Sequence, residues 1–170
     1  MGLKTTLQTA HSALEEKNIP HAIIGGFALA VHNVPRATQD IDLLADGASK
    51  ELIIEALTKK GFKLIHSSEE VLQFDGVGNL DILLAKRPLS LEMLKNAKPI
   101  PSLNINCVST EDIIGLKIQA YVNNPKRELQ DKADIQALVT KNSNVDWDQI
   151  KKYADLFQQW DVIKKFKGTK

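Results

Sequence analysis

Residues 24–43 read IGGFALAVHNVPRATQDIDL, and this stretch decides the fold of the 170-residue chain. The short run His21–Ile24 predicts a buried strand that ends at two glycines. Phe27–His32 is expected to form a short helix, which ends before Pro35 because the position preceding a proline disfavours helical backbone. Strict alternation over Asp40–Leu44 predicts a second strand with one acidic face.

Three aspartates form the candidate catalytic and metal-binding set. Asp40 and Asp42 stand two positions apart, so on a strand their carboxylates point the same way. Like charges held this close repel unless a cation neutralises them, and oxygen ligands select a hard ion such as Mg²⁺ or Mn²⁺. Asp81 is the only acid in the apolar strand Leu80–Ala85, where a role as third metal ligand would supply the partner that a buried charge requires. Taken alone, an Asp-x-Asp pair is also common on solvated sheet faces.

The glycine pair Gly25-Gly26 is a candidate phosphate-binding element. Backbone without side chains lets a phosphate approach closely, and the first N–H groups of the following helix attract anions. The alternative interpretation is a tight strand-to-helix turn that binds nothing.

The rest of the pattern predicts a single domain over residues 1–170, with an α/β core to about residue 108 and a helical part from about residue 109. Further strands are expected at Phe62–His66, Val71–Phe74, Leu80–Ala85 and Leu103–Val108. Helices are expected at Lys4–Lys17, Ser49–Lys60, Ser90–Asn96, from Ser109 or Thr110 to Val122, at Lys126–Thr140 and at Asp146–Phe166.

Charge and composition narrow the classes of function. The chain has 22 Lys+Arg against 21 Asp+Glu, a formal net charge of +1, which gives no support to non-specific nucleic-acid binding. The single cysteine, Cys107, excludes an internal disulfide, and no Cys-x-x-Cys or Cys/His cluster points to zinc. No segment approaches the ~20 apolar residues that span a bilayer, and the N-terminus lacks the apolar region of a signal peptide. We therefore expect a cytoplasmic protein that does not contact a membrane.

These motifs resemble the nucleotidyltransferases of the DNA polymerase beta superfamily. The signature of that superfamily is an apolar residue, Gly-Gly or Gly-Ser, a short helix, Asp-x-Asp on the next strand and a third carboxylate on a later strand. The chain is most similar to the minimal bacterial branch that includes the AbiEii-type toxin nucleotidyltransferases. It shares with them the Gly-Gly form, the Arg-x-Thr-x-Asp-Ile-Asp run at 36–42, a helix like Asp112–Ala120, then Lys126-Arg127 and Asp131–Ile135.

The resemblance covers roughly residues 20–140. It implies a mixed, twisted sheet of about four to six strands flanked by helices, with a C-terminal helical part. It also implies transfer of a nucleoside monophosphate from a nucleoside triphosphate (NTP) to an acceptor hydroxyl, assisted by two metal ions. Asp40 and Asp42 would hold the ions, and Asp81 would ligate the one nearer the acceptor and assist its deprotonation. The expected nucleotide-binding residues are Gly25, Gly26, Arg36, Thr38, Lys117 and Arg127.

Some of these roles have alternatives. Lys117 is expected to place a charge on the β- or γ-phosphate, or else to be an exposed lysine of an amphipathic helix. Arg36 would contact the nucleotide or form a structural ion pair, and Thr38 is expected to hydrogen-bond locally and fix its loop. Asp134 would pair with Lys117 or Lys132.

The partners follow from the same resemblance. Besides the NTP, the acceptor would be an RNA 3′ end (such as that of tRNA), a protein side chain or a small molecule such as an antibiotic. The toxin branch implies an antitoxin partner protein. The alternative from a different class is a non-catalytic nucleotide- or protein-binding module on the same fold.

Overall fold

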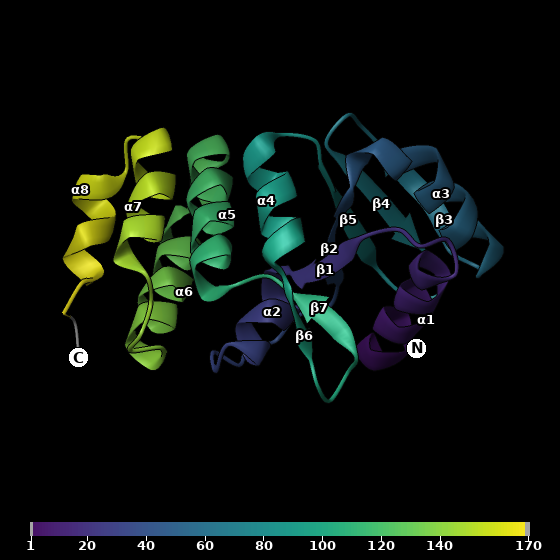
Figure 1. Ribbon diagram of the computed structural model, residues 1–170, viewed down its shortest axis with the longest axis horizontal. Coiled ribbons are helices and arrows are strands. Elements are labelled where there is room, and N and C mark those ends of the chain that lie inside the picture. The colour runs from purple at the N-terminus through teal and green to yellow at the C-terminus, as the bar shows by residue number, and fades with distance from the viewer. Residues whose placement is uncertain (1, 169–170) are drawn as a thin grey trace. The chain divides into compact units, whose positions relative to one another are not determined.

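The computed structural model describes residues 2–168, which divide into two compact units (Figure 1). The sheet unit contains the residues up to Ala28 together with Ala37–Val108, and the helical unit contains Leu29–Arg36 and the residues from Ser109 onward. The organisation of the chain as a single domain stays a prediction. Across residues 2–168, no helix is both long enough and apolar enough to cross a membrane.

The sheet unit is built on one mixed sheet, which in the described part of the chain has seven strands in the order β3-β4-β5-β2-β1-β7-β6. β2 pairs in parallel with β5, and β1 pairs in parallel with β7, while the other neighbours are antiparallel. Parallel neighbours require a long connection, and α3, β3 and β4 lie between β2 and β5 in the chain. The strands are β1 (His21–Ile24), β2 (Ile41–Asp46), β3 (Lys63–Ser67), β4 (Val71–Asp75), β5 (Leu80–Ala85), β6 (Lys98–Ile100) and β7 (Ile105–Cys107).

Helices pack on this sheet through their apolar faces. α1 buries Leu7, Ala10 and Leu14, which recur at helical spacing, and it contacts α3 and β2. α4 contacts β2 and β5. The helices of this unit are α1 (Leu3–Glu15), α3 (Lys50–Lys59) and α4 (Pro88–Asn96), with a 3₁₀ turn at Gly47–Ser49. α2 (Gly25–Val31) begins in the sheet unit, and its last residues belong to the helical unit.

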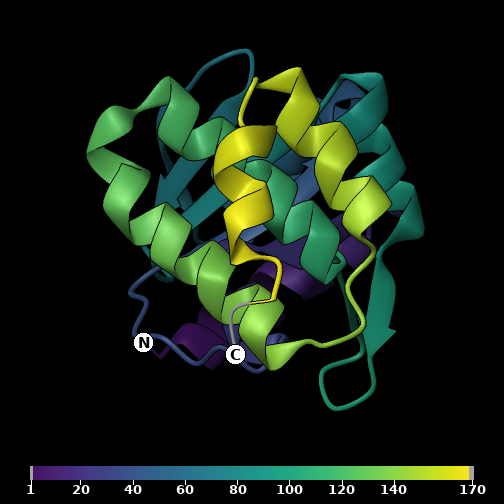
Figure 2. The ribbon, with the colours of Figure 1, turned by 90° about the vertical axis from the view of Figure 1, so that its left-hand side faces the viewer.

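The helical unit is centred on α5, which contacts both α6 and α7; Figure 2 views these helices, coloured from green to yellow. α5 starts at a capping box in which the Ser109 hydroxyl accepts from the Asp112 N–H and the Asp112 carboxylate accepts from the Ser109 N–H. The helices are α5 (Thr110–Asn123), α6 (Glu128–Lys141), α7 (Trp147–Leu156) and α8 (Trp160–Ile163), with 3₁₀ turns at Pro125–Arg127 and Lys164–Phe166.

The α/β class predicted from the sequence is confirmed, and the sheet is larger than the four to six strands expected. The additional strand, β6, is three residues long and contains Pro99, which sheets accept at an edge because an edge strand leaves N–H positions unpaired. The expected strand Leu103–Val108 is shorter and forms β7.

The prediction of one C-terminal helix over Asp146–Phe166 is wrong. The helix stops at Leu156 because Gln158 adopts a left-handed backbone with a φ of 55°, and the Gln159 N–H closes the end by donating to the Ala154 carbonyl at 2.7 Å. Helical spacing of aromatic residues marks a buried face, and it does not reveal a break between two helices that share that face.

Candidate functional site

The three predicted carboxylates lie together on the sheet unit. Asp42 in β2 stands directly beside Asp81 in the parallel strand β5, and Asp40 comes just before β2 begins. One oxygen from each of the three carboxylates lies within 4.8 Å of the others, and all three residues are half-buried. The structure thus brings Asp40, Asp42 and Asp81 into one acidic cluster, called the carboxylate cluster below.

Strand register explains how Asp81 is oriented. Asp81 pairs with Asp42 on one side and with Gln73 of β4 on the other, so the three side chains follow one row across the sheet. Gln73 Nε2 donates to both carboxylate oxygens of Asp81, at 3.2 and 3.1 Å. Burial raises the pKa of Asp81, the Gln73 hydrogen bond opposes this, and the charge of Asp40 raises it further.

Asp40 is held by the residue two positions before it. The Thr38 hydroxyl lies 2.9 Å from Asp40 Oδ1, to which it donates. A Cβ on Gly26 would come within 2.8 Å of that hydroxyl oxygen, so the glycine makes room for Thr38. Gly26 and Thr38 therefore act together to fix the loop that carries Asp40.

Gly25 is required on two grounds. Its φ of +65° lies in the left-handed region, and a Cβ at this position would overlap the carboxylate of Asp42. α2 begins at Gly25, two residues before the expected start of the helix, so both glycines lie in its first turn. Backbone free of side chains is consequently placed directly against the carboxylate cluster.

Three other predicted residues meet in the helical unit. Lys117 is only 8% exposed, and its Nζ lies 2.9 Å from Asp131 Oδ1 and 2.6 Å from Asp134 Oδ2. Arg127 Nε donates to Asp131 at 3.0 Å, and Arg36 Nη1 donates to Asp134 at 2.6 Å. These five residues, called the Lys117 network below, contain three cations and two buried carboxylates.

The Lys117 network decides between several of the earlier alternatives. Lys117 is not an exposed surface lysine, Arg36 forms an ion pair with Asp134, and Asp134 pairs with Lys117. Whether Arg36, Lys117 and Arg127 also contact a nucleotide stays a prediction.

Sequence reasoning missed Gln73, although a signal was present. Residues 75–79 read DGVGN, which is typical of a turn centred on Val77, and a hairpin with that centre pairs residue 73 with residue 81. A polar residue placed opposite a buried acid is a candidate for orienting it.

Comparison with known proteins places the fold. A family model described as aminoglycoside-2''-adenylyltransferase matches residues 6–85. A search of curated proteins gave no match.

Three solved structures illustrate the structural likeness. The solution structure of the antibiotic-resistance factor ANT(2'')-Ia has a TM-score of 0.70 at 17% identity, covering 95% of this chain and 94% of that one. The crystal structure of ANT(2'')-Ia with adenylyl-2''-tobramycin has a TM-score of 0.68 at 18% identity, covering 91% and 96%. The lincomycin-bound lincosamide antibiotic adenylyltransferase LnuA has a TM-score of 0.56 at 16% identity, covering 80% and 96%. The chain therefore has the nucleotidyltransferase fold over almost its whole length.

Proposed function

We propose that this protein is a metal-dependent nucleotidyltransferase that moves a nucleoside monophosphate from an NTP to a hydroxyl of a small-molecule acceptor. The observation that carries the proposal is the carboxylate cluster, in which Asp40, Asp42 and Asp81 gather within 4.8 Å beside the Gly25-Gly26 backbone. The match of residues 6–85 to an adenylyltransferase model supports the same reaction class.

The donor atoms of the carboxylate cluster are suited to divalent cations. Its ligands are carboxylate oxygens, which suit hard ions such as Mg²⁺ or Mn²⁺. Thr38 and Gln73, which donate to Asp40 and Asp81, are neutral and do not compensate the charges of these two acids. Burial and, after it, the charge of Asp40 raise the pKa of Asp81, and a bound cation would act in the opposite direction.

The proposed reaction forms a bond between the acceptor oxygen and the α-phosphorus of the NTP and breaks the bond to the pyrophosphate leaving group. When bound, two divalent ions would activate the acceptor oxygen and stabilise the leaving oxygen. Asp40 and Asp42 would hold the ions. Asp81 would ligate the ion nearer the acceptor, where its carboxylate could accept the proton of the acceptor hydroxyl. The Gly25-Gly26 backbone leaves space for the triphosphate, and Gln73 and Thr38 keep the acids in position. Nucleotide contacts of Arg36, Thr38, Lys117 and Arg127 complete the proposal and rest on the sequence resemblance.

A small-molecule acceptor is preferred over RNA or protein. The family model and the ANT(2'')-Ia and LnuA structures concern antibiotic adenylyltransferases, and the net charge of +1 provides no general attraction for RNA. The toxin role, the AbiEii-type branch, the antitoxin partner and the cytoplasmic location rest on the sequence alone and stay predictions.

The test is transfer of label from α-phosphate-labelled NTPs, with Mg²⁺ or Mn²⁺, to a panel of aminoglycosides and lincosamides, to tRNA and to total protein. We expect label only in a small-molecule fraction with wild-type protein and with Asp155→Asn, an exposed control on α7. Asp42→Asn should give none. Label in tRNA or protein would replace the proposed acceptor, and transfer that survives Asp42→Asn would refute the proposed site.

A nucleotide titration separates catalysis from the alternative of a non-catalytic binding module. The proposal requires that NTP binding depends on Mg²⁺ or Mn²⁺ and weakens in Asp40→Asn. An NTP affinity that is the same with and without the metal, and unchanged in Asp40→Asn, would favour the binding module.

A further inference from the structure

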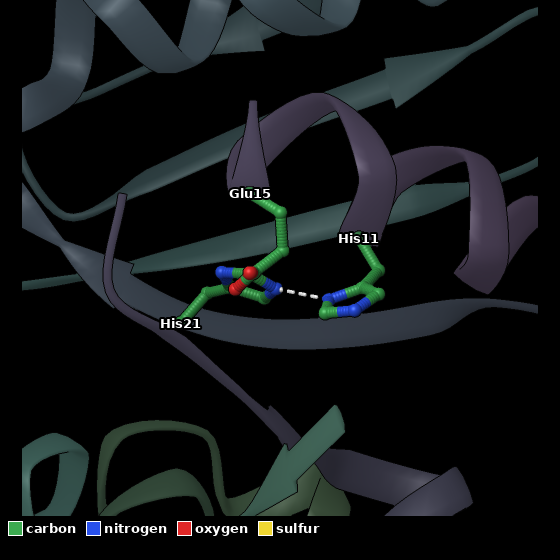
Figure 3. Close-up of side chains that lie close together, drawn as sticks. All are labelled: His11, Glu15 and His21. Atoms are coloured by element: carbon green, nitrogen blue, oxygen red, sulfur yellow. Dashed lines mark hydrogen bonds between the residues drawn. The ribbon is translucent and has the colours of Figure 1, made fainter. Parts of the chain in front are cut away.

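A second cluster of ligating side chains joins α1 to β1 in the sheet unit, and Figure 3 shows its members, His11, Glu15 and His21. His11 and Glu15 are four positions apart on α1, so they share one face of the helix. His21 is the first residue of β1. One ligand atom from each residue lies within 4.8 Å of the other two.

The ring of His21 is oriented as in a metal ligand. Its Nδ1 lies 2.7 Å from the Ile19 carbonyl oxygen, and since a carbonyl only accepts, Nδ1 carries the proton. Nε2 therefore presents its lone pair, and it does so toward His11, whose Nδ1 lies 2.8 Å away (Figure 3). Metal-bound histidines usually donate their second ring N–H to a carbonyl or carboxylate in this way.

His21 is the buried member of the cluster. The residue is 5% exposed. Glu15 is exposed and His11 is half-buried, so the cluster opens to solvent on the side from which an ion would enter.

We propose that His11, Glu15 and His21 form a binding site for Zn²⁺ or a similar transition-metal ion, with water as the fourth ligand. Two imidazole nitrogens and one carboxylate oxygen are a donor set that suits Zn²⁺, whereas Mg²⁺ prefers oxygen alone. Tetrahedral Zn²⁺ with Zn–N bonds of ~2.0–2.1 Å holds two nitrogens about 3.3 Å apart. The 2.8 Å pair of His11 and His21 therefore has to open only slightly, through side-chain rotation. His11 Nδ1, which donates to His21 Nε2 in the metal-free protein, has to carry its proton on Nε2 instead, so that its own lone pair faces the ion.

This site is separate from the carboxylate cluster. His21 pairs with Ala45 at one end of β1, whereas Ile24 pairs with Asp42 at the other end, and three strand residues span about 10 Å. A bound ion would tie α1 directly to the first strand of the sheet, so its role would be to stabilise the sheet unit. The inference does not depend on the proposed transferase activity.

The experiment is calorimetric titration of the full chain, freed of metals with a chelator, with Zn²⁺ in the presence of excess Mg²⁺. Mg²⁺ competes at the carboxylate cluster and not at imidazoles. We expect one Zn²⁺ per chain, a rise in the temperature of unfolding, and visible absorption of four-coordinate Co²⁺ when Co²⁺ replaces Zn²⁺. His11→Gln and Glu15→Gln, which alter side chains that are not fully buried, should each weaken Zn²⁺ binding by about 100-fold or more.

Two variants provide matched controls. His66→Gln removes an exposed histidine of β3, and Asp42→Asn removes a ligand of the carboxylate cluster; both should keep the Zn²⁺ affinity of the wild type. The proposal is overturned if the wild type binds no Zn²⁺ in excess Mg²⁺. It is equally overturned if His11→Gln and Glu15→Gln bind as the wild type does, or if Asp42→Asn abolishes binding.

Discussion

The carboxylate cluster and the Lys117 network use the same residue type in opposite ways. Asp131 and Asp134 are 1% and 7% exposed, and three cations contact them. Asp40 and Asp81 are more exposed, and the side chains that donate to them, Thr38 and Gln73, are neutral. Removing a cation from Asp131 and Asp134 would leave buried charges unpaired, which is costly, whereas in the proposed function the carboxylate cluster receives its compensating charge from a bound ion.

The sharpest test of this contrast is Asp42→Asn. If the carboxylate cluster holds the catalytic ions, transfer should fall by about 1000-fold or more, because several kcal/mol of transition-state stabilisation are lost. The free energy of unfolding should change little, since repulsion with the neighbouring acids is relieved at the same time. Initial rates and urea unfolding of the same preparation measure both. A large loss of stability would show instead that Asp42 is a structural residue.

The converse is expected for Lys117→Met. Removing the ammonium leaves Asp131 and Asp134 buried without their shared partner, which should cost about 3–5 kcal/mol in the free energy of unfolding. Urea unfolding measures the loss. The control is Lys59→Met, which breaks an exposed pair with Glu55 and should cost less than about 1 kcal/mol. Equal stabilities of the two variants would remove the distinction between the buried network and a surface ion pair.

The two glycines should differ in how well they tolerate a side chain. Gly25→Ala places a Cβ in a left-handed backbone, which costs about 1–2 kcal/mol by itself, and forces it against the Asp42 carboxylate. Gly26→Ala requires Thr38 to shift, because the new Cβ would lie 2.8 Å from its hydroxyl oxygen and 2.9 Å from its Cβ, but Gly26 has no left-handed backbone, so its loss should be smaller. Thermal unfolding and transfer rates should both rank Gly26→Ala nearer the wild type, and the reverse order would contradict the close approach of Gly25 to Asp42.

The smallest effects are expected at Gln73. Gln73→Leu removes the hydrogen bonds to Asp81 and should raise the Mg²⁺ concentration needed for half-maximal transfer by about 10-fold. Transfer measured across a Mg²⁺ series tests this. Gln73→Glu is unsuitable as a control because it adds a charge, whereas Gln136→Leu on α6 leaves the sheet unit unchanged.

The raised pKa of Asp81, which burial and the charge of Asp40 cause and the Gln73 hydrogen bonds oppose, predicts a pH effect in the metal-free protein. Because the folded-state pKa of Asp81 is raised, its contribution to stability is present below the unfolded-state pKa and is lost as pH rises through the folded-state pKa. Asp81→Asn should remove this contribution to the pH dependence. Urea unfolding in chelator from acidic to neutral pH measures it, and an unchanged profile would argue against the raised pKa.

Much of the sheet unit follows from local sequence signals. The short run that ends at Gly25-Gly26 predicted β1, and the runs on either side of residues 75–79 predicted β4 and β5 closely. The roles of Asp40, Asp42 and Asp81 were inferred from their spacing and from the family resemblance. The parallel register that sets Asp42 beside Asp81 was not predictable, because no local signal aligns two strands separated by α3, β3 and β4.

Pairing between side chains far apart in the sequence was likewise only partly predictable from the sequence. The pairing of Asp134 with Lys117 or Lys132 was predicted as a choice, and the structure selects Lys117. The ion pair of Arg36 with Asp134 joins distant parts of the sequence, and only the tertiary fold selects it.

The parallel pairing of β2 with β5 also bears on the order in which the chain folds. The hairpin of β4 and β5 closes through a short turn, whereas β2 can join β5 only after the whole intervening segment has collapsed. We therefore expect the acids to meet late, when most apolar surface is already buried. Their mutual repulsion then opposes only the last step, the pairing of β2 with β5, and does not affect formation of the β4–β5 hairpin.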